Sequence, residues 1–321
     1  MCIEFKNSPL VSICCNTYNH ENYIRQCLEG FAIQKTTFNF EILVHEDAST
    51  DQTANIVKEY EITNTQMLRC VYQTENQFRK QNTLTNVLLP MALGKYIALC
   101  EGDDYWTDPY KLQKQVDFLE AHKEYSFCFH NSNVLNENEA PPIRKQQING
   151  IDKDTFFTED LIRQWFIPTA SMVFVKDRLE IPDWFKNVQS GDIALALLLS
   201  LKGPAKYLDE VMSVYRLHPN GLSNTHIGYN KFLSMCYLYQ SFNIHTNYKF
   251  NDKIIQEIKY EFERHALGYE NKKLAEAELK NILASTEYLS SKVSFGQALV
   301  LLLYKLRLGK IYKIMRRGLK G

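Results

Sequence analysis

The sequence predicts an α/β protein built on a doubly wound, mostly parallel sheet with helices on both faces. Over the first 130 residues, short apolar segments of strand length alternate with segments of helical spacing. Polar clusters follow several of the apolar segments, and the composition is that of a globular protein, with 45% hydrophobic and 23% charged residues. Alternating strands and helices are typical of a parallel sheet that helices cover on both sides.

Five strands and four helices are expected in this first part of the chain. The apolar segments that predict strands are residues 10–15, 40–45, 68–72, 96–100 and 125–129. Helical spacing of apolar side chains is found within 24–31, 54–60, 84–91 and 112–119. We expect the third helix to end at Gly94 in a C-cap position, and the fourth to start behind Pro109.

The remaining chain is expected to change character twice. Residues 135–147 are polar and contain Pro141 and Pro142, which predicts a loop or linker. Residues 150–217 return to mixed structure, with a helix over 193–201 and a strand over 211–217. Beyond residue 220 helices are predicted at 251–266, 270–284 and 294–318. This pattern divides the chain into residues 1–225, with halves 1–134 and 135–225, and a helical C-terminal region, 226–321.

Charge and cysteine content narrow the class of protein. Lysine plus arginine equals aspartate plus glutamate at 37 each, so no overall field indicates a nucleic-acid partner. The N-terminus lacks a basic segment followed by an apolar one, and no window approaches the ~20 apolar residues of a membrane-spanning helix. Eight cysteines without a C-x-x-C motif are compatible with four disulfides, but we expect reduced, buried thiols in a cytoplasmic protein.

Three polar clusters follow predicted strands, at residues 16–19, 46–51 and 101–106. Ligands of open parallel sheets bind outside the carboxyl ends of the strands, so these clusters are expected to line one crevice. Each cluster alone also has a simpler explanation as a turn or a helix N-cap.

Asp103 and Asp104 form the sharpest of these signals. Adjacent carboxylates behind a buried strand repel each other unless a cation or ligand hydroxyls compensate, and Mg²⁺ or Mn²⁺ prefers such oxygen ligands. The alternative is an exposed acidic turn. Neither G-x-x-x-x-G-K-[ST] nor G-x-G-x-x-G occurs in the sequence, which disfavours ATPases and NAD-dependent dehydrogenases.

These motifs carry a resemblance to a known family. The chain reads V-S-I at residue 11, T-Y-N at 17, E-I-L-V-H-E-D-A-S-T-D at 41, and E-G-D-D-Y-W-T-D-P-Y-K-L at 101. In this order and spacing they resemble family 2 of the inverting glycosyltransferases, of the bacterial surface-polysaccharide type, over roughly residues 9–222. The resemblance implies the GT-A fold for residues 1–225, with a nucleotide-binding half (1–134) and an acceptor half (135–225).

The resemblance also implies a donor site. Asp47 would accept a hydrogen bond from the base, in a pair that reads Glu-Asp here where relatives have Asp-Asp. Asp103 would hold the ribose or sugar, and Asp104 would bind the Mn²⁺ or Mg²⁺ ion that bridges the pyrophosphate. The other implied donor-site residues are Thr17, Tyr18 and Asn19 in the nucleotide pocket, Ser49 in the loop that supports it, and Arg79 near the base or phosphates. Arg79 is equally compatible with a solvated loop charge.

The acceptor half would supply the catalytic base. Inversion needs a group that deprotonates the acceptor hydroxyl, and Asp192, before the apolar helix at 193, is the candidate. An N-cap or first-turn acid is the structural alternative, and Asp183 and Asp209 fit the spacing less well. His218, in Tyr-Arg-Leu-His at 215–218, resembles a residue that approaches the metal or pyrophosphate; a surface histidine is the alternative.

The sequence thus indicates a metal-dependent enzyme that moves a sugar from a nucleotide donor, expected to be UDP-linked, to a glycan or lipid-linked acceptor. A catalytically silent sugar-nucleotide or glycan-binding module is the alternative. A nucleotidyltransferase is disfavoured because this chain has no glycine-rich loop after its first predicted strand.

Eight basic and no acidic residues follow residue 287. Residues 294–321 therefore predict a basic amphipathic helix that lies on an anionic membrane or packs on the catalytic domain. The expected location is cytoplasmic or peripheral on the inner membrane face.

Overall fold

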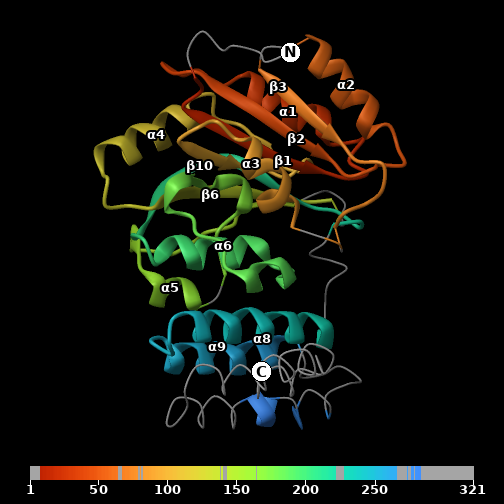
Figure 1. Cartoon of the computed structure of the whole chain (residues 1–321). Helices are drawn as coiled ribbons and strands as arrows, with labels where there is room; N and C mark the ends of the chain where they lie inside the picture. The colour runs from red at the N-terminus through yellow and green to blue at the C-terminus, as the bar shows by residue number, and fades with distance from the viewer. Residues whose placement is uncertain are drawn as a thin grey trace, which may run out of the picture. The chain divides into compact units, whose positions relative to one another are not determined.

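The computed structural model describes residues 8–63, 67–78, 80, 82–137, 139, 143–163, 165–221 and 228–265, together with 273, 276–277 and 279–282. The chain divides into two compact units, Met1–Thr225 and His226–Gly321. The first unit contains a large sheet with strand order β3-β2-β1-β4-β9-β6-β10-β5 (Figure 1). The α/β fold class is confirmed, and helices are present in the C-terminal unit as expected.

The first half of the sheet is parallel. β1 (Val11–Thr17) pairs with β2 (Phe40–Glu46) on one side and β4 (Tyr96–Leu99) on the other, and β2 pairs with β3 (Leu68–Tyr72). In register, Asn16 stands beside His45 and Thr17 beside Glu46. The carboxyl ends of β1 and β2 therefore meet at one edge of the sheet, followed there by the polar clusters that the sequence predicts to converge.

The second half of the sheet mixes strand directions. β9 (Val173–Val175) lies antiparallel between β4 and β6 (Phe127–Asn136), and β6 runs parallel to β10 (Ala205–Leu217). The expected loop over 135–147 is in part wrong: β6 extends to Asn136, and β7 (Ile143–Gln146) pairs antiparallel with it. Two short strands, β5 (Tyr105–Trp106) and β8 (Thr155–Phe156), also pair with β10. These short or polar strands depend on pairing with distant partners, which local patterns do not record.

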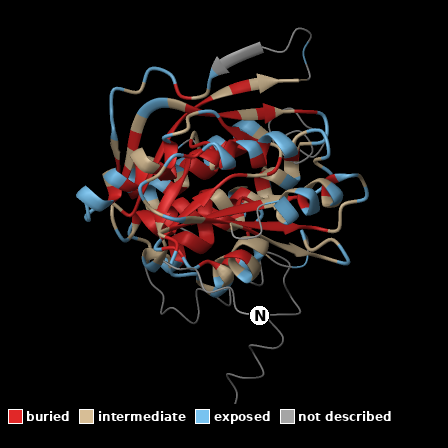
Figure 2. Cartoon of the chain, turned by 90° about the horizontal axis from the view of Figure 1, so that it is seen from above, coloured by how far each residue is buried: buried red, intermediate tan, exposed pale blue. Residues whose placement is uncertain are grey.

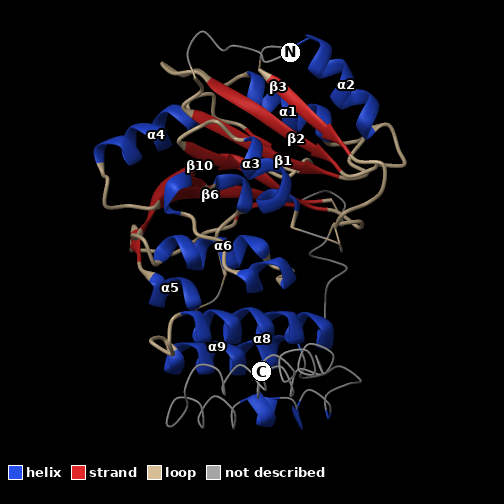
Figure 3. Cartoon of the chain, viewed as in Figure 1, coloured by secondary structure: helices blue, strands red, loops and turns tan. Residues whose placement is uncertain are grey.

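Helices cover both faces of this sheet (Figure 3). The helical elements of the unit are α1 (Ile24–Ala32), α2 (Thr53–Thr63), η1 (Leu84–Leu88), α3 (Leu89–Met91), α4 (Lys111–Ala121), α5 (Thr158–Ile162), η2 (Thr169–Ser171), η3 (Lys176–Arg178), η4 (Asp183–Asn187) and α6 (Gly191–Ser200). The predicted third helix is a π-helical turn followed by a short α-helix, and its C-cap is Ala92. Gly94 is needed for another reason, because a Cβ there would lie 2.5 Å from the Ser12 nitrogen.

The core follows the period of two that strands impose. Ile13 and Cys15 of β1 point to the face covered by α1, α2 and α4, where they join one hydrophobic cluster with Val57 and Leu112. Residues on the opposite face of the strands, such as Leu43, are equally buried. Figure 2 shows the buried centre of the sheet enclosed by helices whose outer faces are exposed. Burial on both faces explains why the strands read as continuous apolar runs.

One of the charged groups within this core is a carboxylate. Glu41 of β2 is fully buried and accepts hydrogen bonds from Ser12 Oγ at 2.6 Å and from the Leu93 amide at 2.7 Å. Arg69 of β3 forms an ion pair with the same carboxylate. A buried carboxylate is tolerated only when donors of this kind replace water. The network ties β1, β2, β3 and the chain before β4 together.

The C-terminal unit contains two described helices that pack on each other, α8 (Gly228–His245) and α9 (Asn251–His265), with the Phe232 and Phe262 rings 5.7 Å apart. α9 matches the helix predicted at 251–266, whereas α8 is absent from the predicted set. The helix predicted at 270–284 is described only in part, and the one at 294–318 lies outside the described residues. Among described helices, none has the length and apolarity to cross a bilayer. The seven described cysteines are free thiols, and all but Cys70 are buried.

Candidate active site

The loops that follow β1 and β2 are bound to each other. The Asn19 amide donates to Ser49 Oγ at 2.9 Å, and the Thr50 amide donates to Asn19 Oδ1 at 2.8 Å. Asn19 has a φ of 54°, a left-handed conformation that asparagine adopts more readily than most residues. Both predicted donor-site residues, Asn19 and Ser49, therefore shape this edge of the site through mutual contacts.

Asp47 lies at the same edge and is buried. Its amide donates to the Thr17 carbonyl at 3.0 Å, and its Oδ1 accepts from the Gln77 amide at 2.7 Å. His45 Nε2 lies 3.9 Å from the same oxygen. Tyr18, beside it, is 40% exposed, so its ring is accessible. Arg79, the remaining predicted member of this region, lies outside the described residues.

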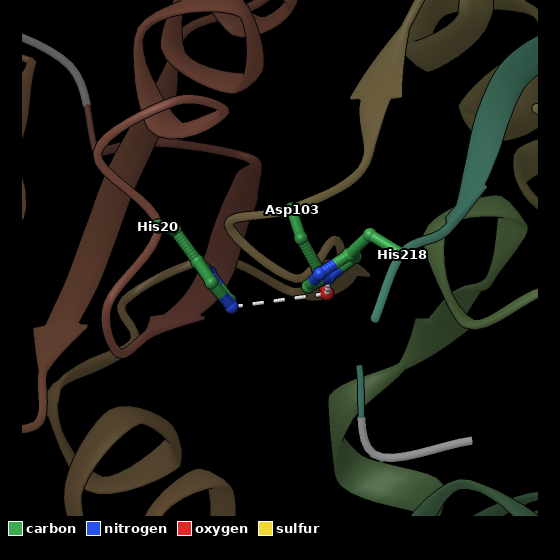
Figure 4. Close-up of side chains that lie close together, drawn as sticks. All are labelled: His20, Asp103 and His218. Carbon is green, nitrogen blue, oxygen red and sulfur yellow. Dashed lines mark hydrogen bonds and ion pairs between the residues drawn. The ribbon is translucent and has the colours of Figure 1, made fainter. Parts of the chain in front are cut away.

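A cluster with metal-ligand chemistry forms where β1, β4 and β10 end. One ligand atom each from His20, Asp103 and His218 lies within 4.8 Å of the others. His218 Nε2 lies 3.1 Å and His20 Nε2 lies 3.8 Å from Asp103 Oδ2 (Figure 4). Figure 4 shows the two imidazoles reaching this carboxylate from different segments of the chain. Two imidazoles and a carboxylate form a ligand set suited to a divalent transition ion.

Neighbouring groups fix the orientation of His20. Thr17 Oγ1 lies 3.3 Å from His20 Nδ1, which leaves Nε2 as the nitrogen that faces Asp103. Such outer contacts commonly orient a histidine that binds metal. Gly102 permits this packing, since a Cβ there would lie 2.6 Å from Thr17 Oγ1 and 3.0 Å from His20 Nδ1.

Asp104 has different surroundings from Asp103. Its carboxylate is 3% exposed, and Oδ1 accepts from the Arg216 backbone amide at 2.9 Å. Among the described residues, the cluster that could hold a metal contains Asp103 and not Asp104. The structure thus brings together only part of the predicted metal pair, His218 with Asp103 in place of Asp104.

Arg216, in β10, binds the backbone of the loop that contains Asp103 and Asp104. Its Nη1 donates to the Asp103 carbonyl at 2.6 Å, and its Nε lies 3.4 Å from Glu137 Oε1. The guanidinium lies 5.0 Å from the Tyr23 ring centroid and 4.5 Å from that of Tyr105. A buried arginine held between two aromatic faces is a rigid support. Its hydrogen bond therefore holds the Asp103 backbone in place.

Asp192 lies in the first turn of α6, the position that the sequence predicts. The eight residues from Ile193 to Ser200 are all buried, which is typical of a helix that is apolar all round. Thr169 Oγ1 donates to Asp192 Oδ2 at 3.3 Å. Asp192 also acts electrostatically on Glu101, the residue directly after β4. The candidate base therefore lies within electrostatic range of the acidic loop that contains Asp103.

The charges of the site act on one another. Burial, with the charges of Asp103 and Asp192, raises the pKa of Glu101 to about 8. Burial and the charge of Asp103 also raise the pKa of Asp104 well above its usual value. Burial alone would raise the pKa of Asp103 too, but the His218 hydrogen bond and the nearby imidazoles hold it below its usual value. Burial lowers the pKa of His20 although Asp103 opposes this. Carboxyl groups that resist ionisation together favour a bound cation.

Three members of this site were not predicted from the sequence. His20 directly follows the T-Y-N motif and Arg216 stands in Tyr-Arg-Leu-His, but no local spacing connects either with Asp103. Glu101 belongs to the acidic cluster that the sequence singles out, yet nothing there indicates its approach to Asp192. The neighbouring motif residues were the available signal, and the missing information was the sheet topology that brings the ends of β1, β4 and β10 together.

Comparison with known families and curated proteins gives a consistent result. The glycosyl transferase family 2 model matches residues 12–177. The uncharacterized protein Rv1520 of Mycobacterium tuberculosis is 38% identical over 217 residues, 66% of this chain and 60% of that protein. The chain thus spans about 60% of the length of these mycobacterial relatives. The Escherichia coli UDP-Glc:alpha-D-GlcNAc-diphosphoundecaprenol beta-1,3-glucosyltransferase WfaP is 27% identical over 216 residues, 67% of this chain and 80% of WfaP.

Solved structures share the fold. Staphylococcus aureus TarS 1-349, determined with UDP-GlcNAc, superposes with a TM-score of 0.63 at 16% identity, over 96% of this chain and 92% of that one. The mannosyltransferase PcManGT from Pyrobaculum calidifontis, determined with GDP-Man and Mn²⁺, gives a TM-score of 0.54 at 15% identity, over 96% and 88% of the two chains. At this identity the likeness establishes the fold.

Proposed function

Because the chain belongs to glycosyl transferase family 2, we propose that it transfers a sugar, with inversion, from a UDP-linked donor to a hydroxyl of a lipid-linked glycan. The chain is a glycosyltransferase of the GT-A fold; donor, metal, stereochemistry and acceptor are the proposal. WfaP, whose name includes UDP-Glc and a diphosphoundecaprenol-linked acceptor, and the UDP-GlcNAc complex of TarS support this choice of substrates.

The observation that carries the proposal is the convergence of His20, Asp103 and His218, with Asp192 close enough to act electrostatically on Glu101 of the same loop. The three ligand atoms come from segments far apart in the chain and lie within 4.8 Å of one another. Asp192 approaches from α6 and acts on Glu101 in the same acidic loop. A cation that stabilises the leaving diphosphate and a carboxylate that accepts the acceptor proton are the two groups that a metal-dependent inverting transfer would use.

The ligand set fits a divalent ion. Carboxylate oxygen suits Mg²⁺ and Mn²⁺, whereas imidazole nitrogen suits transition ions, so the combination favours Mn²⁺ over Mg²⁺. His20, Asp103 and His218 would hold the ion. When bound, it would neutralise charge on the departing diphosphate.

The protein's own residues would perform the other steps. Asp192 would accept the proton of the acceptor hydroxyl as its oxygen bonds to the anomeric carbon. The glycosyl–phosphate bond breaks on the opposite face, and its electron pair leaves with the nucleoside diphosphate. Asp47, which is buried, would accept a hydrogen bond from the base. Arg216 would keep Asp103 in place through the Asp103 carbonyl.

A nucleotide-sugar screen tests the function. Full-length protein with Mn²⁺ is incubated with UDP- and GDP-sugars, and release of the nucleoside diphosphate is measured with and without diphosphate-lipid glycan acceptors. We expect turnover with a UDP-sugar that disappears on addition of EDTA and returns with Mn²⁺. UDP should likewise raise the melting temperature only with Mn²⁺ present. Metal-independent UDP binding without turnover would instead support the silent binding module.

We also propose that the basic C-terminal segment, residues 294–321, brings the enzyme to an anionic membrane where a lipid-linked acceptor resides. This segment lies outside the described residues, and the proposal rests on its basic residues alternating with apolar ones in the sequence. Deletion of residues 294–321 should move the protein from the pellet to the supernatant in sedimentation with anionic vesicles. Full-length protein that never pellets with such vesicles would contradict it.

A further inference from the structure

A short helical turn stands beside the candidate base. η2, Thr169–Ser171, precedes β9, and Thr169 Oγ1 donates to Asp192 Oδ2 at 3.3 Å. Thr169 is 23 residues away from Asp192 in the chain, so the contact results from tertiary structure. The Thr169 hydroxyl thus donates to a carboxylate in the first turn of a helix whose other residues are largely apolar.

Buried groups fix this turn to the rest of the sheet. Trp106 Nε1 donates to the Ala170 carbonyl at 2.8 Å, and Gln115 Nε2 donates to the Ser171 carbonyl at 2.8 Å. Lys111 Nζ donates to Gln115 Oε1 at 2.7 Å and lies 3.9 Å from the Trp106 ring centroid. Trp106, Lys111 and Gln115 are all buried. The turn therefore has a fixed backbone, and Thr169 is presented to Asp192 from a rigid support.

Because acidic groups lie near Asp192, a hydrogen-bond donor to its carboxylate affects how readily that carboxylate ionises. Glu101, which directly follows β4, interacts electrostatically with Asp192 and carries the same sign when ionised. Asp103, in the same loop as Glu101, also acts electrostatically on Glu101. Its own helix contributes the favourable N-terminal end of α6. Against acidic neighbours, a hydrogen bond to the charged form favours ionisation.

We propose that Thr169 is a positioning residue for the reaction: its hydroxyl holds the Asp192 carboxylate in one orientation and stabilises its ionised form. The inference rests on the proposed role of Asp192 as the base. A base that is oriented and ionised before the acceptor binds needs no rearrangement at the moment of proton transfer. The buried Trp106 and Gln115 contacts supply the rigidity for this arrangement.

The test is the pH dependence of kcat/KM for Thr169→Val, which keeps the shape of the side chain and removes the hydroxyl. The acid limb of that profile reports ionisation of the essential base in the free enzyme. We expect it to move to higher pH by about half to one unit, with kcat near neutral pH lowered by about fivefold and the donor KM little changed. Thr169→Ser, which restores a hydroxyl, should return the acid limb to its wild-type position.

Ser171→Ala is the matched control. Ser171 Oγ donates to the Pro168 carbonyl within the same turn at 2.6 Å and does not contact Asp192. Its loss should lower the melting temperature without moving the acid limb. A wild-type acid limb in Thr169→Val, or an equal displacement in Ser171→Ala, would overturn the inference.

A second measurement needs no substrate. In a double-mutant cycle, the melting temperatures of wild type, Thr169→Val, Asp192→Asn and the double variant are compared at pH 7.5 and pH 4.5. A coupling present at pH 7.5 and diminished at pH 4.5 supports stabilisation of the ionised carboxylate, and zero coupling at both values overturns it. Absence of sugar transfer by wild-type protein would end the proposed function, whereas this cycle reports on the Thr169 contact alone.

Discussion

Asp192→Asn is expected to lower kcat by about 10²–10⁴-fold, the range that a positioned general base contributes. Asparagine has nearly the same shape and can still occupy the first turn of α6, but it cannot accept the acceptor proton. UDP and Mn²⁺ should bind as before because Asp192 is not among the described metal-ligand set. Steady-state turnover and a thermal shift with UDP and Mn²⁺, measured on one preparation, separate the two effects.

Asp183→Asn is the appropriate comparison for this variant. Asp183 belongs to the same half of the enzyme and is an alternative acid in the sequence, but it is exposed in η4. The Asp183→Asn variant should transfer sugar at the wild-type rate. Retained transfer by Asp192→Asn, or its loss in Asp183→Asn, would move the base to another residue.

Asp103→Asn should abolish Mn²⁺-dependent binding of UDP and with it most of the activity. Both His20 Nε2 and His218 Nε2 face the Asp103 carboxylate, so the change removes the only negative charge of this three-residue set. The loss in metal affinity should exceed the roughly 10–100-fold effect of losing an outer-shell partner. Titration of UDP binding at increasing Mn²⁺ concentration measures it.

Asp104→Asn tests which of the two neighbouring carboxylates, Asp103 or Asp104, binds the metal ion. Asp104 accepts the Arg216 backbone amide, and an asparagine carbonyl can keep that hydrogen bond. We expect a modest change in melting temperature and a preserved Mn²⁺ requirement. Loss of Mn²⁺-dependent UDP binding in Asp104→Asn, with retention in Asp103→Asn, would restore Asp104 as the metal ligand that the sequence resemblance implies.

The fold was largely predictable because its strands are buried on both faces. Residues such as Ile13 and Val44 belong to uninterrupted apolar runs, and the helices between them show apolar side chains at helical spacing. The parts that were missed depend on partners elsewhere. β7 has a polar sequence, Ile-Arg-Lys-Gln, and is a strand because it pairs with β6.

The motifs of the candidate site were predictable from the sequence, whereas the contacts between residues of different motifs were less so. The positions of Asp47 and Asp192 at element ends follow from strand and helix boundaries that local patterns indicate. Arg216 is in a strand-like segment, but its position below Asp103 depends on the pairing of β5 with β10. The nucleotide-binding roles of Thr17, Tyr18, Asn19, Ser49 and Arg79 stay predictions.

The sequence alone determined the family, the parallel first half of the sheet and the chain segments that contain the chemistry, since each depends on residues close together in the chain. Only the tertiary structure decided which acidic side chain faces the imidazoles, that His20 joins them, and that Thr169 reaches Asp192. The direction of a side chain after a strand ends depends on the backbone around it. Here Arg216 and Trp106 hold the backbone at Asp103 and Ala170 from distant segments.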